Sequence, residues 1–68
     1  MLWKPELSNK TEIPLLVNAK DKQAAVNNIS SWLKHQDENT RIFFTGTKTP
    51  VVADCIPLKE EIFGVIVI

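Results

Sequence analysis

The chain has 68 residues, of which 44% are hydrophobic, and its eight basic residues balance eight acidic ones to a formal net charge of zero. A chain of this length forms one small domain, residues 1–68, which buries only about 60% of its unfolded surface. The neutral balance excludes an overall electrostatic field that would attract nucleic acid or an acidic membrane surface. Because there is one cysteine, a disulfide within the chain is excluded too.

The sequence shows no segment typical of secretion or membrane insertion. Met1–Pro5 lacks the charged start and the apolar stretch of a secretion signal, so we expect a cytoplasmic protein. The apolar run at residues 62–68 is far shorter than the roughly 20 residues that a membrane helix needs. We therefore expect no membrane contact.

The first half of the chain predicts an arm, a strand and a helix. Residues 1–11 contain proline and polar residues without a sustained period, which predicts a loose N-terminal arm. Glu12–Asn18 alternates like a strand, and Pro14, which lacks an N–H, suggests a strand start or an edge strand. From Asp21, a good N-cap, a helix is expected over about Lys22–Gln36. Its apolar stripe comprises Ala25, Val26, Ile29, Trp32 and Leu33.

The second half predicts three more strands. Arg41–Thr45 has the β-branched and aromatic content of a strand, and Gly46–Pro50 has the composition of a turn. Val51–Ile56 is then expected to return as the hairpin partner, and Ile62–Ile68 to form a terminal strand. The prediction is an α+β domain in the order β-α-β-β-β, with an antiparallel-rich sheet of three or four strands and one amphipathic helix on one face.

The terminal strand gives the strongest indication of function. In the alternation of a strand, Ile62, Ile66 and Ile68 lie on one face, and Phe63, Val65 and Val67 lie on the other. Both faces are apolar, whereas a half-exposed strand alternates apolar with polar residues. One helix covers one face only. The other face must be covered by the N-terminal arm, by a second copy of the chain in a homodimer, or by a different protein.

Catalytic and metal-binding signatures are not found in the sequence. His35 and Cys55 are the only residues of their types, which excludes a zinc cluster of the usual ligands. The sequence predicts that His35 is an exposed residue at a helix end and that Cys55 is an inert, buried thiol. A Cys-His pair would have to be assembled by folding. We therefore expect neither an enzyme nor a cofactor.

Residues Glu12–Phe44 carry a resemblance to a known class of proteins. A strand containing EIPLL leads through Val17-x-Ala19-x-Asp21 into a helix bearing Ile29 and Trp32, and then into the expected strand at Phe44. This pattern resembles the small β-α-β-β proteins that bacteriophages encode to disable host machinery, such as an RNA polymerase inhibitor and anti-CRISPR proteins. The resemblance implies an accessory protein of a phage or mobile element that binds and inhibits or modulates a larger host protein complex.

Two functional hypotheses follow from these observations. The first is a non-enzymatic protein-binding module, because interfaces rest on a few buried aromatic and basic anchors. The expected partner-binding residues are Trp3, Arg41, Phe43, Lys48 and Phe63. The alternative is a small nucleic-acid-binding or transcription-regulating protein, in which basic residues surround Phe43 as a stacking platform. Those basic residues are Lys20, Lys22, Lys34, Arg41 and Lys48.

Overall fold

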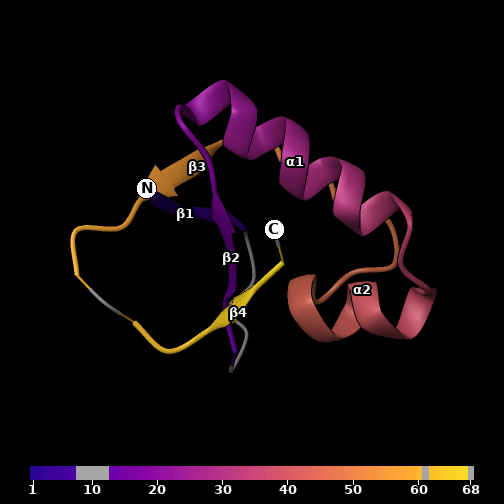
Figure 1. The fold of residues 1–68 in the computed structure, drawn as a ribbon. Helices are drawn as coiled ribbons and strands as arrows, with labels where there is room; N and C mark the ends of the chain where they lie inside the picture. The colour runs from indigo at the N-terminus through magenta and orange to yellow at the C-terminus, as the bar shows by residue number, and fades with distance from the viewer. Residues whose placement is uncertain (8–12, 61, 68) are drawn as a thin grey trace.

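The computed structural model describes residues 1–7, 13–60 and 62–67. These residues contain four short strands and two helices. In chain order they are β1 (Leu2–Pro5), β2 (Leu15–Asn18), α1 (Lys22–Lys34), α2 (Glu38–Thr45), β3 (Cys55–Pro57) and β4 (Val65–Ile66). The strands form one sheet in the order β3-β1-β2-β4. As Figure 1 shows, α1 crosses one side of this sheet, and α2 lies below α1 on the side of β4.

The expected α+β class is confirmed, and the sheet has four strands where three or four were expected, but the predicted order of elements is wrong. The elements follow one another as β-β-α-α-β-β, with two helices instead of one. β1 runs antiparallel to both β2 and β3, whereas β2 and β4 are parallel, so the sheet is mixed. The sheet is mixed because the C-terminal strand β4 pairs with β2, a strand from the first third of the chain, in the parallel direction.

The start of the chain is a central strand, which corrects the prediction of a loose arm for its first residues. β1 pairs with β2 through Trp3 opposite Val17, and with β3 through Pro5 opposite Cys55. The Met1 carbonyl oxygen also accepts a hydrogen bond of 2.9 Å from the N–H of Ala19. Pairing along both edges holds a segment whose own four residues carry little strand signal. The expected arm also included residues 8–11, which lie outside the described residues.

Helix α1 confirms the amphipathic pattern of the sequence. The Asp21 side chain accepts a hydrogen bond of 2.8 Å from the N–H of Ala24, which satisfies one of the unpaired donors at the helix start. The helix ends at Lys34, one residue after its last buried residue and two residues before the expected end. Its buried side chains are those of Ala25, Ile29 and Leu33. They cover β1, β2 and β3.

Helix α2 replaces the strand that was predicted over Arg41–Thr45. The Asp37 side chain caps it by accepting a 2.8 Å hydrogen bond from the N–H of Thr40. Gly46 ends it in the left-handed conformation, with φ of 78° and its N–H 2.7 Å from the Ile42 carbonyl oxygen. Two good caps therefore outweigh the β propensity of the residues between them. The hairpin expected after this segment is wrong too. Gly46 ends a helix instead of opening a turn between two strands, and β3 pairs with β1.

The core lies between α1 and the sheet. Leu15 and Val17 of β2 point toward it, together with the indole of Trp3, whose Nε1–H donates to the Ala19 carbonyl oxygen at 3.1 Å. Leu16 is just as buried but points to the opposite face of the sheet by the alternation of a strand. Gly64 lies against it, since a Cβ added there would stand 3.0 Å from two Leu16 side-chain carbons. The segment leading into β4 therefore covers part of the second face.

Candidate functional site

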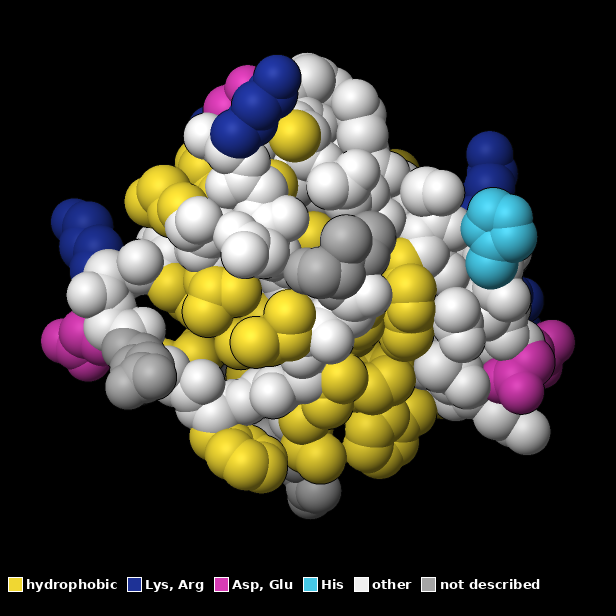
Figure 2. Space-filling view, in the orientation of Figure 1, with side chains coloured by type: hydrophobic (Ala, Val, Ile, Leu, Met, Phe, Trp, Pro, Cys, Tyr) yellow, Lys and Arg dark blue, Asp and Glu magenta, His cyan; other side chains and the backbone are white. Residues whose placement is uncertain are grey.

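An apolar surface remains exposed around β4 and on α2. We call it the β4 apolar surface, and its members are Ile42, Phe43, Ile62, Phe63, Val65 and Ile66. Phe63 is 86% exposed, Ile66 57% and Phe43 54%. Figure 2 shows hydrophobic side chains gathered on the face that carries β4 and the neighbouring end of α2. An apolar area of this kind is more typical of an interaction site than of a free surface.

Among the described residues, strand β4 is paired along one edge only, and its other edge lies beside this surface. The N–H groups of Val65 and Val67 donate to the carbonyl oxygens of Pro14 and Leu16 at 3.0 and 2.9 Å. Because N–H groups alternate in direction along a strand, the N–H of Ile66 points away from β2. β4 is the last strand of the sheet, and no described strand lies beyond it. Its outer edge therefore presents backbone groups on which another strand can pair.

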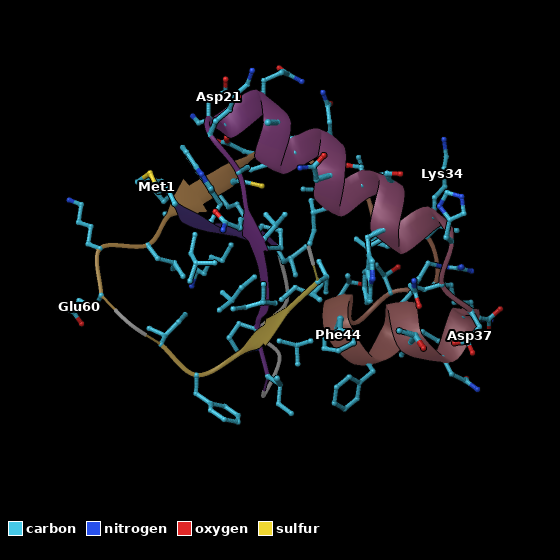
Figure 3. All side chains as sticks on the ribbon, in the orientation of Figure 1. Met1, Asp21, Lys34, Asp37, Phe44 and Glu60 are labelled. Carbon is cyan, nitrogen blue, oxygen red and sulfur yellow. The ribbon has the colours of Figure 1, made fainter. Side chains whose placement is uncertain are left out.

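The aromatic residues of α2 connect the β4 apolar surface to the core. The rings of Phe43 and Phe44 meet edge to face with centroids 4.9 Å apart, and Phe44 meets Trp32 of α1 in the same way at 5.8 Å. Phe44, which is labelled in Figure 3, and Trp32 both pack against the core. Phe43 is thus exposed but in contact with a ring that packs against the core, which suits an anchor residue.

A second feature is an open groove of about 440 Å³ between the end of α1, helix α2 and the segment 48–52. Its lining is apolar at Leu33, Pro50, Val51 and Val52, polar at Ser30 and Thr49, and basic at Lys34, Arg41 and Lys48. No acidic residue is among these described lining residues. The lining therefore carries three basic side chains and no acidic one, and Glu38 partly offsets the charge of Lys48 from outside the groove.

Hydrogen bonds fix the guanidinium of Arg41 in this groove. Its Nε–H donates to the Lys48 carbonyl oxygen at 2.8 Å, and its Nη1 donates to the carbonyl oxygen of Gln36. The hydroxyl of Thr45, which is buried, donates to the Arg41 carbonyl oxygen at 2.5 Å. The Lys48 ammonium is 3.8 Å from a Glu38 carboxylate oxygen, and both side chains are largely exposed. Arg41 is thus held rigidly, whereas Lys48 can exchange its partner at little cost.

Three ionisable groups have shifted pKa values, and each shift has a structural cause. The N–H of Thr40 lowers the pKa of Asp37 by hydrogen bonding to its carboxylate at the start of α2. Lys22, whose Nζ is 3.3 Å from Asp54 Oδ1, lowers the pKa of Asp54. Burial raises the pKa of the Cys55 thiol. All three groups have structural roles: Asp37 caps α2, Asp54 pairs with Lys22, and Cys55 lies in the core.

The geometry separates the only histidine from the only cysteine. Asp54 pairs with Lys22 at the first residue of α1, so the adjacent Cys55 lies at that end of the helix. His35 caps the other end, where its Nδ1 lies 2.8 Å from the Ser31 carbonyl oxygen. The 13 residues between them span roughly 20 Å at 1.5 Å per residue. The two side chains therefore do not form a nucleophile and base.

Residues 1–7, 13–60 and 62–67 contain no group of three or more His, Cys, Asp or Glu side chains that could hold a metal ion. Within the same ranges, neither helix has the length and apolar character needed to cross a membrane.

The residues predicted as partner anchors fall in three different environments. Trp3 is 8% exposed in the core, so this fold does not present it to a partner. Phe43 and Phe63 lie exposed on the β4 apolar surface. Arg41 and Lys48 meet in the groove. The sequence did not indicate the apolar floor of that groove, because its members come from α1 and from a segment expected to be a strand.

Comparisons with known proteins return no match: no family model, curated protein or solved structure is similar to this chain.

Proposed function

We propose that this protein is a non-enzymatic binding module that docks onto another protein through the β4 apolar surface. The observation that carries the proposal is the 86% exposure of Phe63 next to the unpaired edge of β4. A domain of this size has little apolar surface to leave in water. Phe63 is exposed almost completely, and three more apolar residues of the same segment are exposed beside it, namely Ile62, Val65 and Ile66. This favours a surface that is buried in a complex.

The proposed contact is the addition of an extended partner segment to the edge of β4. The outward N–H and C=O of Ile66 offer the first backbone hydrogen bonds. Phe63 and Phe43, both exposed, then supply side-chain anchors. Backbone pairing contributes affinity in this binding mode, and the aromatic side chains select the partner.

The identity of the partner is a further part of the proposal and rests on the sequence resemblance alone. That resemblance implies a larger host protein complex which the chain inhibits or modulates. It depended on a β-α-β-β pattern over Glu12–Phe44, where the structure has a strand and two helices. The β4 apolar surface supports the binding of a protein. It favours an inhibited partner no more than a partner that is bound without being inhibited.

The test is site-specific photo-crosslinking in lysates of cells that produce the protein. A photoreactive phenylalanine analogue replaces Phe63 in one sample and the exposed Lys59 in a control sample. We expect the first position to give one discrete adduct with a second protein and the control to give none. An excess of the unmodified protein should compete this adduct away, whereas an excess of Phe63→Asp, which should keep an unchanged melting temperature because the side chain is exposed, should not.

Three results would contradict the proposal. Crosslinking at position 63 to many proteins without preference would indicate non-specific hydrophobic binding. Equal adducts at positions 63 and 59 would indicate that the partner binds through another surface. An adduct only with a second copy of the chain would assign the surface to a homodimer, which light scattering of the purified protein would show as twice the monomer mass. In that case the surface would be an assembly contact instead of a docking site.

A further inference from the structure

The groove between α1, α2 and the segment 48–52 has the properties of a separate recognition site. Its volume of about 440 Å³ falls within the range of ligand sites, roughly 300 to 1,000 Å³. Val51, at its rim, is 85% exposed, whereas the neighbouring Val52 is buried in the core. The groove thus joins a fixed apolar floor to an apolar side chain that nothing in the described part of the chain covers.

Arg41 has no described carboxylate within salt-bridge distance, although the charge of Asp37, one helical turn earlier, lies near enough to interact with it. Two of its five N–H donors are used by the carbonyl oxygens of Lys48 and Gln36. Both bonds fix the plane of the guanidinium and leave three N–H donors, on Nη1 and Nη2, with which a carboxylate can pair. Within the described ranges neither Arg41 nor Lys34 forms an ion pair, and Lys48 has only its 3.8 Å contact with Glu38.

We infer that this groove binds an acidic peptide segment of a partner protein. An apolar side chain of the peptide lies on Leu33, Val51 and Val52, and flanking carboxylates pair with the basic residues Lys34, Arg41 and Lys48. The inference deepens the proposed protein-binding function and rests on it. It places a second contact on a surface different from the β4 apolar surface.

The chemistry of the lining favours an acidic peptide over nucleic acid. Single-stranded nucleic acid is bound by aromatic rings on which bases stack, along a positive track for the phosphates. No aromatic residue is among the described lining residues, and Phe43 is not part of the groove. Aliphatic side chains beside three cations instead match a peptide in which a leucine or similar residue stands among glutamates or aspartates.

The experiment starts from a displayed library of random 12-residue peptides, selected on the immobilised full chain. We expect the selected peptides to be enriched in acidic residues next to a large apolar residue. One selected peptide is then synthesised with a fluorescent label, and its affinity is measured by anisotropy. The double substitution Lys34→Gln, Lys48→Gln should weaken binding about fivefold, the effect of losing two exposed ion contacts. The matched control Lys20→Gln, Lys59→Gln removes the same charge elsewhere and should leave the affinity unchanged.

Amide chemical shifts locate the contact and separate this inference from the proposed function. On addition of the peptide we expect shifts at Lys34, Thr49 and Val52, in both the unmodified protein and Phe63→Asp. Selection without acidic enrichment, equal loss in the control variant, or shifts confined to Val65 and Ile66 would each overturn the inference. Displacement of the peptide by an unstructured oligothymidine at equal concentration would assign the groove to nucleic acid instead.

Discussion

Gly64 is the residue at which β4 depends most directly on the absence of a side chain. A Cβ at this position would lie 2.8 Å from the Pro14 carbonyl oxygen and 3.0 Å from two carbons of Leu16. The carbonyl belongs to the backbone of the segment entering β2, so it cannot turn aside as a flexible side chain would. Gly64→Ala must therefore push the segment of β4 away from β2.

The magnitude follows from two opposing effects. Inserting a methyl group into a packed contact costs about 1–3 kcal/mol. The reduced freedom of the unfolded chain offsets about 0.4–1 kcal/mol of this. A net loss of about 1–2 kcal/mol is large for a domain of 68 residues, whose total stability is on the order of 3–10 kcal/mol. It corresponds to a fall in melting temperature of roughly 4–16 °C.

Thermal unfolding and amide hydrogen exchange measure the result. We expect the amides of Val65 and Val67, which donate to β2, to lose protection. If β4 detaches alone, the melting temperature falls less, but these two amides still exchange faster. The Ala19 amide, which bonds to Met1, should keep its protection relative to global unfolding. Unchanged protection at Val65 and Val67 with an equal or higher melting temperature would refute the close contact between Gly64 and β2.

Three further outcomes are expected. Gly46→Ala should lower stability by about 1 kcal/mol, because φ of 78° strains an L residue, and exchange should increase in α2 but not in β4; an unchanged stability curve would contradict the left-handed cap. Cys55 should react with a thiol reagent at pH 8 at least about tenfold more slowly in the native protein than in urea, because the thiol is buried and its pKa raised; equal rates would show that the core opens there. The pKa values of Asp37 and Asp54 are lowered in the fold, so their contribution to stability is present above the ordinary carboxyl pKa and is lost as the pH falls through the lowered values. In melting curves recorded over a pH series, Asp37→Asn should reduce this loss of stability at acid pH. An unchanged dependence of melting temperature on pH would contradict the role of the Asp37 charge.

Helix α1 and helix α2 illustrate what local pattern can predict. In α1 the apolar stripe and the cap at Asp21 agree, and the helix was predicted to within two residues of its observed end. In α2 the two kinds of signal conflict, since Ile42 and Phe43 favour a strand while Asp37 and Gly46 are typical helix caps. The edge-to-face packing of Phe44 on Trp32 favours the helix, and that contact joins two elements across a turn.

Strand β1 and the groove depended on pairings that no local pattern contains. Four residues with a proline at the end carry too weak a signal for a strand, and β1 is stable because β2 and β3 bond to both of its edges. The groove needs the end of α1, the helical form of α2 and the return of the segment 48–52 at once. A prediction that placed Arg41 on a strand could not bring it together with Val51.

The sequence by itself determined the α+β class, the helix α1 and the presence of a C-terminal apolar run with more apolar surface than one helix covers. These properties follow from residue type and spacing, which act within a few turns or along one strand. Only the tertiary structure decided that β4 is a parallel edge strand, that Trp3 is core and that Phe63 is exposed. The reason is that strand order and burial depend on the summed free energy of contacts between segments far apart in the chain, and β2 pairs with β4 across 50 residues that no local period connects.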